Sequence, residues 1–76
     1  MSISYTIEKE LGQFGMTTQG ARKLLSLVSW NGRPAKYDLR AWHPEDDGRL
    51  KPGKGITLSE DEARALLSVL EEHFGD

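Results

Sequence analysis

Aromatic and basic side chains alternate in the middle of this 76-residue chain. Trp30 and Trp42 enclose a stretch that also carries Arg33, Lys36 and Arg40. Rings of this kind can stack on nucleobases while cations neutralise phosphates, the combination that holds single-stranded nucleic acid. The same composition also suits an ordinary small domain, with both tryptophans in a core or dimer interface and the cations as surface charge. The pattern alone leaves both interpretations open.

The charges of the chain are unevenly distributed, although the net charge is only −2. Residues 22–54 contain eight basic and four acidic side chains, whereas the flanking segments contain two basic and eight acidic ones. Such asymmetry says more about partners than the total charge does. It favours an anionic partner for the central segment.

Catalytic and metal-binding chemistry finds little support in the sequence. The chain has no cysteine, which excludes a disulfide framework and a thiolate metal site. His43 and His73 have no evident partner for a nucleophile–base pair. His43 could bind a cation with the acidic turn at 45–47, but oxygen-rich turns of this kind usually stay solvated. We therefore predict a protein that is not an enzyme and that needs no cofactor or metal.

A hairpin must position the aromatic and basic residues, because Asn31-Gly32 is a strong hairpin signal between two apolar-rich runs. A two-residue turn would pair Trp30 with Arg33, whereas a three-residue loop would pair Trp30 with Pro34. A slip of one residue exchanges the two faces. We favour the longer loop, because Pro34 lacks an N–H and suits the end of a tight hairpin poorly. The longer loop places Arg22, Trp30, Lys36, Arg40 and Trp42 on one face, and Leu25, Leu27, Ala35, Tyr37 and Leu39 on the other.

The two faces of this hairpin are expected to differ in role. Tyr37 is in phase with Leu39, so their face is expected to enter the core. Asp38 stands between Lys36 and Arg40, where its carboxylate would repel a phosphate. We expect Asp38 to orient Arg40 through an ion pair instead.

The remaining elements follow from periodicity and end signals. Strands are predicted near residues 4–11, 21–30, 34–42 and 50–58, with a glycine-rich loop between the first two. Ser59 and Glu62 have the spacing of a capping box, which begins a helix near residues 60–74. The helix carries one apolar stripe, formed by Ala63, Leu66, Leu67, Leu70 and Phe74. The prediction is one α+β domain over residues 1–76, an antiparallel four-stranded meander followed by a helix. The sequence shows neither a signal peptide nor a membrane span, so we expect a cytoplasmic protein.

Three motifs together resemble a known family. They are Trp-Asn-Gly-Arg-Pro, Lys-Tyr-Asp-Leu-Arg-Ala-Trp and Lys-Pro-Gly-Lys-Gly-Ile-Thr-Leu, followed by an acidic-capped helix. The succession resembles the positive cofactor four family of transcriptional coactivators, and most closely its bacterial YdbC-like branch, over about residues 5–70. The resemblance implies a curved sheet, a homodimer, and binding of single-stranded DNA along the concave sheet faces without strong sequence preference.

The resemblance also implies site residues. Trp30 and Trp42 match aromatic positions, Arg33, Arg40, Lys51 and Lys54 match basic ones, and either Arg22 or Lys23 matches a basic position on the second strand. Val28 or Ser29 stands where eukaryotic members have a further basic residue, so weaker binding is expected. With Lys36 from the hairpin pattern, the predicted nucleic-acid-binding set is Arg22, Lys23, Trp30, Arg33, Lys36, Arg40, Trp42, Lys51 and Lys54.

The partners implied are single-stranded DNA, a second copy of the chain and, as a possibility, the transcription machinery. In a bacterium the protein would then associate with the nucleoid. Single-stranded RNA is an alternative ligand, because stacking and phosphate contacts do not require a 2′-hydroxyl. A competing class is a protein-interaction dimer whose sheet face binds an acidic or aromatic protein segment.

Overall fold

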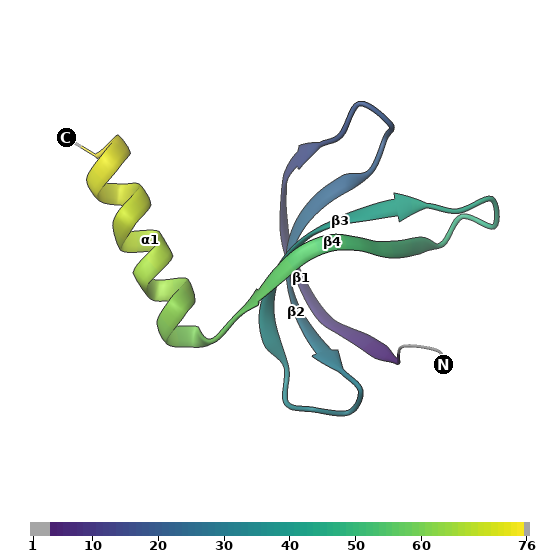
Figure 1. Cartoon of the computed structure of the whole chain (residues 1–76), viewed down its shortest axis with the longest axis horizontal. Coiled ribbons are helices and arrows are strands. Elements are labelled where there is room, and N and C mark those ends of the chain that lie inside the picture. The colour runs from purple at the N-terminus through teal and green to yellow at the C-terminus, as the bar shows by residue number, and fades with distance from the viewer. Residues whose placement is uncertain (1–3, 76) are drawn as a thin grey trace.

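Four strands and one helix make up most of the computed structural model, which describes residues 4–75. The elements are β1 (Tyr5–Met16), β2 (Arg22–Trp30), β3 (Lys36–Pro44), β4 (Leu50–Leu58) and α1 (Glu60–Phe74). The strands form one antiparallel sheet in the order of the sequence, and the helix follows the last strand (Figure 1). The predicted α+β meander with a C-terminal helix is confirmed.

Strand β1 is longer than predicted, since it continues through the glycine-rich segment to Met16. Its pairing with β2 shifts register between Ile7 and Lys9, between Glu10 and Gly12, and again before Gly15. Each shift inserts an extra residue on β1 and bends the strand. Because bulges interrupt the alternation of side chains, the pattern of a strand fades in the sequence after residue 11.

The β2–β3 hairpin has the register of the longer loop, as predicted. Leu25 pairs with Leu39 and Arg22 with Trp42. The turn itself is tight, because both Asn31 (φ 53°) and Gly32 (φ 76°) adopt the positive φ of a type I′ turn. The first regular pair of the ladder is Val28 with Lys36. Two residues separate the turn from this pair on the β2 side, and three residues separate them on the β3 side. The result places Trp30 on the same face as Arg40.

Strand β4 approaches β3 closely at a second irregularity. Arg40 pairs with Gly55 but Trp42 with Pro52, so two residues of β4, Gly53 and Lys54, lie opposite the single residue Ala41 of β3. A Cβ atom on Gly55 would overlap the carbonyl oxygen of Leu39 and lie 2.7 Å from the Cα of Arg40. Glycine is therefore needed where β4 crosses this point, and the bulge adds to the curvature of the sheet.

The buried core lies on the inner face of the curved sheet. Leu24, Val28 and Trp42 form its centre, and Tyr5, Trp30 and Leu50 pack against them. The Tyr5 hydroxyl donates a hydrogen bond to the Leu50 carbonyl (3.3 Å), so the curl brings the start of β1 to the start of β4.

The expectation that the Tyr37 and Leu39 face enters the core is wrong. Both residues are only half-buried, on the outer face of the sheet. The cause is the curl of the sheet, which encloses its inner face within one chain and leaves the outer face to α1 alone. An alternating strand shows that two faces differ, but it does not show which of them the curvature encloses.

Helix α1 begins at the predicted capping box. Ser59 Oγ accepts a hydrogen bond from the Glu62 N–H (3.1 Å), and Glu62 Oε1 accepts one from the Ser59 N–H (2.8 Å). Along the helix, Glu60 raises the pKa of Arg64 above its ordinary value through a hydrogen bond and its charge. The helix projects away from the sheet (Figure 1), and Ala63 is its one half-buried residue, whereas Leu66 and Leu70 are 37% and 44% exposed. Within residues 4–75, no helix has the length and apolarity that crossing a membrane requires.

Candidate nucleic-acid interface

The indole ring of Trp30 stands at the end of β2, half-buried and held from several sides. The Tyr5 ring packs against it at a centroid separation of 5.4 Å. The guanidinium carbon of Arg40 lies 4.8 Å from the centroid of the indole, within the range of a cation–π interaction. The indole N–H donates to Asp38 Oδ2 (3.3 Å). Packing and hydrogen bonding thus fix both the position and the tilt of the ring.

Asp38 and Arg40 form the ion pair expected from the sequence. Arg40 Nε donates to Asp38 Oδ1 (2.9 Å) and Arg40 Nη2 to Asp38 Oδ2 (3.0 Å). The Asp38 side chain is fully buried and that of Arg40 is 15% exposed. A bidentate pair in this environment is geometrically well defined and weakly screened by salt.

Arg40 has its remaining nitrogen bound as well, because Nη1 donates to the Gly53 carbonyl in the β4 bulge (2.7 Å). All three guanidinium nitrogens therefore make hydrogen bonds within the protein. Nη1 and Nη2 each keep a second N–H, so a contact from Arg40 to a nucleic acid stays a prediction. Its guanidinium joins β3 to β4 and supports the Trp30 ring.

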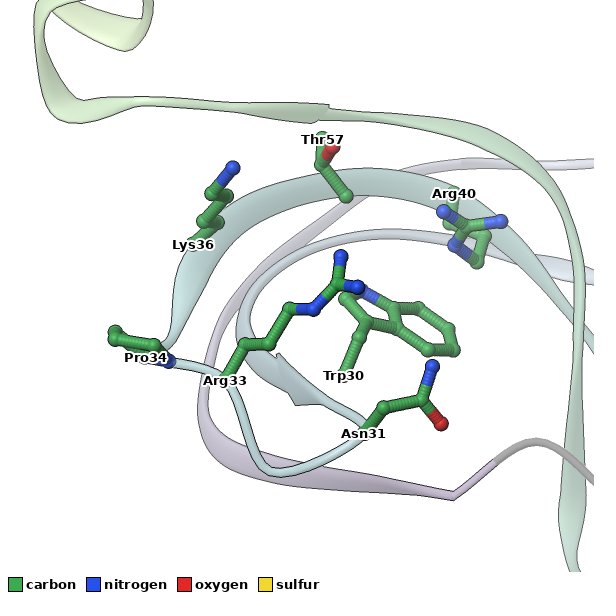
Figure 2. Close-up of a pocket in the computed structure, with 7 residues that line it drawn as sticks. All are labelled: Trp30, Asn31, Arg33, Pro34, Lys36, Arg40 and Thr57. Atoms are coloured by element: carbon green, nitrogen blue, oxygen red, sulfur yellow. The ribbon is translucent and has the colours of Figure 1, made fainter.

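A pocket of about 360 Å³ opens beside this ring. Its lining comes from the hairpin and from one residue of β4: Trp30, Asn31, Arg33, Pro34, Lys36, Arg40 and Thr57 (Figure 2). Arg33 and Lys36 are exposed, and neither forms an ion pair with another residue of the described part of the chain. The pocket thus combines an aromatic surface with two exposed cations that an anion in solution can reach.

Trp42 shares the inner face with Trp30 but is completely buried (0% exposed). Its ring packs against Tyr5, with centroids 5.5 Å apart. The predicted role of Trp42 as a base-stacking surface is therefore revised to that of a core residue. The hairpin register was predicted correctly, but the sheet curls over this end of the inner face and leaves only the Trp30 end open.

The other predicted basic residues lie outside the pocket. Arg22 shares the face of Trp30, but its guanidinium contacts Glu10 (3.3 Å) and Gln13 (3.0 Å). Lys23 pairs with Ala41 and so belongs to the outer face. The structure thus settles which of these two β2 residues points inward.

The two lysines of β4 also lie apart from the pocket. Lys51 pairs with His43, on the same face as Ala41, and Lys54 lies in the β4 bulge. Contacts from Lys51 and Lys54 to a nucleic acid stay a prediction, one that would need a strand extending beyond the pocket.

Three pocket residues were absent from the predicted site: Asn31, Pro34 and Thr57. Asn31 and Pro34 were recognised only as turn residues. Their closeness to Trp30 in the sequence could have indicated that they lie beside its ring. Thr57 reaches the pocket across the sheet, opposite Asp38. Its position depends on the β3–β4 register, which the sequence does not specify.

Within the described residues, no group of three His, Cys, Asp or Glu side chains is placed to hold a metal ion.

Comparison with known proteins identifies the family. Residues 18–69 match the family described as Transcriptional Coactivator p15 (PC4). The chain belongs to this family. The match includes the whole lining of the Trp30 pocket and most of the sheet. It confirms the resemblance seen in the three sequence motifs.

A bacterial relative of this family member extends the similarity beyond the matched segment. A protein of Treponema pallidum (strain Nichols), named only as uncharacterized, is 41% identical over 66 residues. The alignment covers 87% of this chain and 74% of that protein. The bacterial source is consistent with the predicted bacterial branch of the family.

Proposed function

We propose that this member of the p15 (PC4) family binds single-stranded DNA with little sequence preference, as a homodimer. Its role would be transcription regulation or the handling of transient single strands, in the cytoplasm and on the nucleoid of a bacterial cell. The observation that carries the proposal is the Trp30 pocket, where a fixed aromatic ring stands beside the exposed cations Arg33 and Lys36.

The two parts of the pocket would perform different tasks. A base stacking on the Trp30–Arg40 surface gains about 1–3 kcal/mol without regard to its identity, because every base has a π-face. Arg33 and Lys36 would neutralise phosphates and release counterions, so affinity should fall as the salt concentration rises. Asp38 and Tyr5 hold the ring in place before the ligand arrives, which lowers the entropy lost on binding.

The recessed position of Trp30 favours a single strand over a duplex. The bases of a duplex are stacked on their neighbours, whereas the bases of a single strand can turn outward onto an aromatic side chain. Because the Trp30 ring lines a pocket and does not project from the surface, it would stack with a single base that has turned outward. The pocket does not discriminate DNA from RNA by these contacts, and single-stranded RNA is the second ligand to test.

The second copy of the chain is proposed to cover an apolar groove between α1 and the outer face of the sheet. The groove has a volume of about 680 Å³, and its lining is almost entirely apolar. Leu11, Phe14, Leu25, Tyr37, Leu39, Leu58, Leu66, Leu67 and Leu70 supply most of that lining. Exposed apolar surface of this extent marks an interaction site. A homodimer would bury the stripe of α1, which makes little contact with its own sheet, and would enlarge the small core of a 76-residue chain.

Tryptophan fluorescence tests the proposal directly. The protein is titrated with oligo-dT, oligo-U and a duplex of equal length at two salt concentrations. Quenching by the single strands, weaker at the higher salt, is expected because a base stacks on Trp30. The Trp30→Phe variant retains only the buried Trp42 and should show little quenching, which makes it the matched control. The absence of a response to any nucleic acid would contradict the proposal and favour a protein partner.

A further inference from the structure

Asn31, at the tip of the β2–β3 hairpin, forms two hydrogen bonds with Ser4, the residue before β1. Its backbone N–H donates to the Ser4 carbonyl (2.8 Å), and its side-chain Oδ1 accepts a hydrogen bond from the Ser4 N–H (3.2 Å). The Ser4 N–H is a donor and requires an acceptor, so the atom facing it must be the amide oxygen. This contact determines the orientation of the Asn31 amide and places Nδ2 on the opposite side.

The Nδ2 atom of Asn31 is directed toward the pocket. Figure 2 shows the amide nitrogen on the side of the Trp30 ring and the oxygen turned away from it. The amide nitrogen carries two N–H donors. No acceptor of the described residues forms a hydrogen bond with it. A fixed, unused donor therefore borders the surface on which a base is proposed to stack.

We propose that this pocket holds one nucleotide and favours bases with a keto oxygen at the pyrimidine 4-position or the purine 6-position, which accepts a hydrogen bond from Asn31 Nδ2. The inference rests on the proposed binding of single strands and adds a base preference to it. Thymine and uracil carry a keto oxygen where cytosine carries an amino group, and guanine carries one where adenine has an amino group. A fixed N–H donor attracts the first kind of group and repels the second.

The remaining pocket residues do not supply such a choice. Arg33 and Lys36 are cations suited to phosphates, and phosphate contacts carry no information on the base. Stacking on Trp30 accepts any base, and a hydroxyl such as that of Thr57 can either donate or accept a hydrogen bond. The volume of about 360 Å³ lies within the range of about 300–1,000 Å³ found for small-molecule pockets. Asn31 is the one neutral lining residue with an unused donor whose direction is set by a second contact within the protein.

The decisive comparison uses oligo-dU and oligo-dC of equal length, which differ at the pyrimidine 4-position. Affinities are measured by anisotropy of labelled oligonucleotides. The wild-type protein is expected to bind oligo-dU about two- to tenfold more tightly, the effect of one hydrogen bond. Equal affinities for the two would overturn the proposal while leaving single-strand binding intact. Failure to bind either oligonucleotide would overturn the proposed function itself.

Two substitutions assign the preference to the amide. Asn31→Asp keeps the acceptor for the Ser4 N–H and tolerates positive φ, but it removes the Nδ2 donors. Asn31→Gly also tolerates positive φ and removes the side chain without adding a charge. The oligo-dU to oligo-dC affinity ratio should fall to about one in Asn31→Gly. It should fall below one in Asn31→Asp, because the carboxylate puts an acceptor where the donor was and so favours the amino group of cytosine, while its charge lowers both affinities. Emission from the buried Trp42 verifies the fold, and a ratio that persists in both variants would refute the role of Asn31.

Discussion

Asp38 accepts a hydrogen bond from the Trp30 indole at 3.3 Å, so a fully buried carboxylate sets the orientation of a half-buried ring. The same carboxylate holds Arg40 in a bidentate ion pair, and Arg40 stacks on that ring. Three side chains of the hairpin are thereby mutually constrained. The pocket thus owes the orientation of its aromatic surface to a buried acidic residue that is not part of its lining.

Replacing this carboxylate should therefore disturb both stability and the pocket. Asp38→Asn retains the shape but leaves the buried Arg40 guanidinium without its counter-charge. Removing one partner of a buried pair costs about 3–5 kcal/mol. We expect a lower urea midpoint and an altered emission of Trp30. The matched control is Asp47→Asn, since the Asp47–Arg49 pair (3.6 Å) is exposed and should contribute little. Equal stability of the two variants would contradict a structural role for Asp38.

The two tryptophans should respond to substitution in opposite ways. Trp42→Ala empties the core and is expected to lower the free energy of unfolding by about 3–5 kcal/mol. Trp30→Ala should cost less stability but remove about 1–3 kcal/mol of binding free energy for oligo-dT. Urea denaturation and anisotropy of labelled oligo-dT measure the two quantities. A stable Trp42→Ala protein with weakened binding would restore the stacking role first predicted for Trp42.

The salt dependence of binding should identify which cations contact phosphates. Lys36→Ala and Arg33→Ala are each expected to reduce the slope of log affinity against log salt by about 0.7, the value for one contact with a single strand. Arg64→Ala, on the helix and outside the pocket, should leave the slope unchanged. An unaltered slope in both pocket variants would exclude them as phosphate contacts. The same measurement on Lys51→Ala and Lys54→Ala, with a longer oligonucleotide, tests whether the strand continues along β4.

The apolar groove predicts the oligomeric state. Sedimentation at low micromolar concentration should show a dimer for the wild-type protein and a monomer for Leu67→Asp, which puts a charge into the groove lining. Val69→Asp is the control, because Val69 is as exposed as Leu67 (62% against 56%) but does not line the groove. This control should remain a dimer. A monomeric wild-type protein would contradict the homodimer.

Local rules in the sequence predicted most of the fold. The capping box at Ser59, the strand order and the register of the central hairpin followed from residue types at short spacing. The Asp38–Arg40 ion pair was also predictable, because residues two apart on a strand lie on the same face. Each of these features depends on neighbours that are close in the sequence.

Features that depend on distant parts of the chain were not predictable in this way. The length of β1, the β4 bulge and the position of Thr57 follow from pairing between strands. No residue type marks these pairings in advance. The glycines that permit bulges resemble those of an ordinary loop, which is why β1 was predicted to end early.

The sequence by itself determined that Trp42 shares a face with Arg40, opposite the face carrying Tyr37 and Leu39, and it favoured the register that adds Trp30 to the Arg40 face. Only the tertiary structure decided what each part of that face does. The curl produced by the bulges of β1 and β4 brings Tyr5 to Leu50 and closes the inner face over Trp42. It leaves the Trp30 end open beside the exposed cations. Curvature accumulates over all four strands, so no single stretch of sequence specifies which of two equivalent aromatic residues stays accessible.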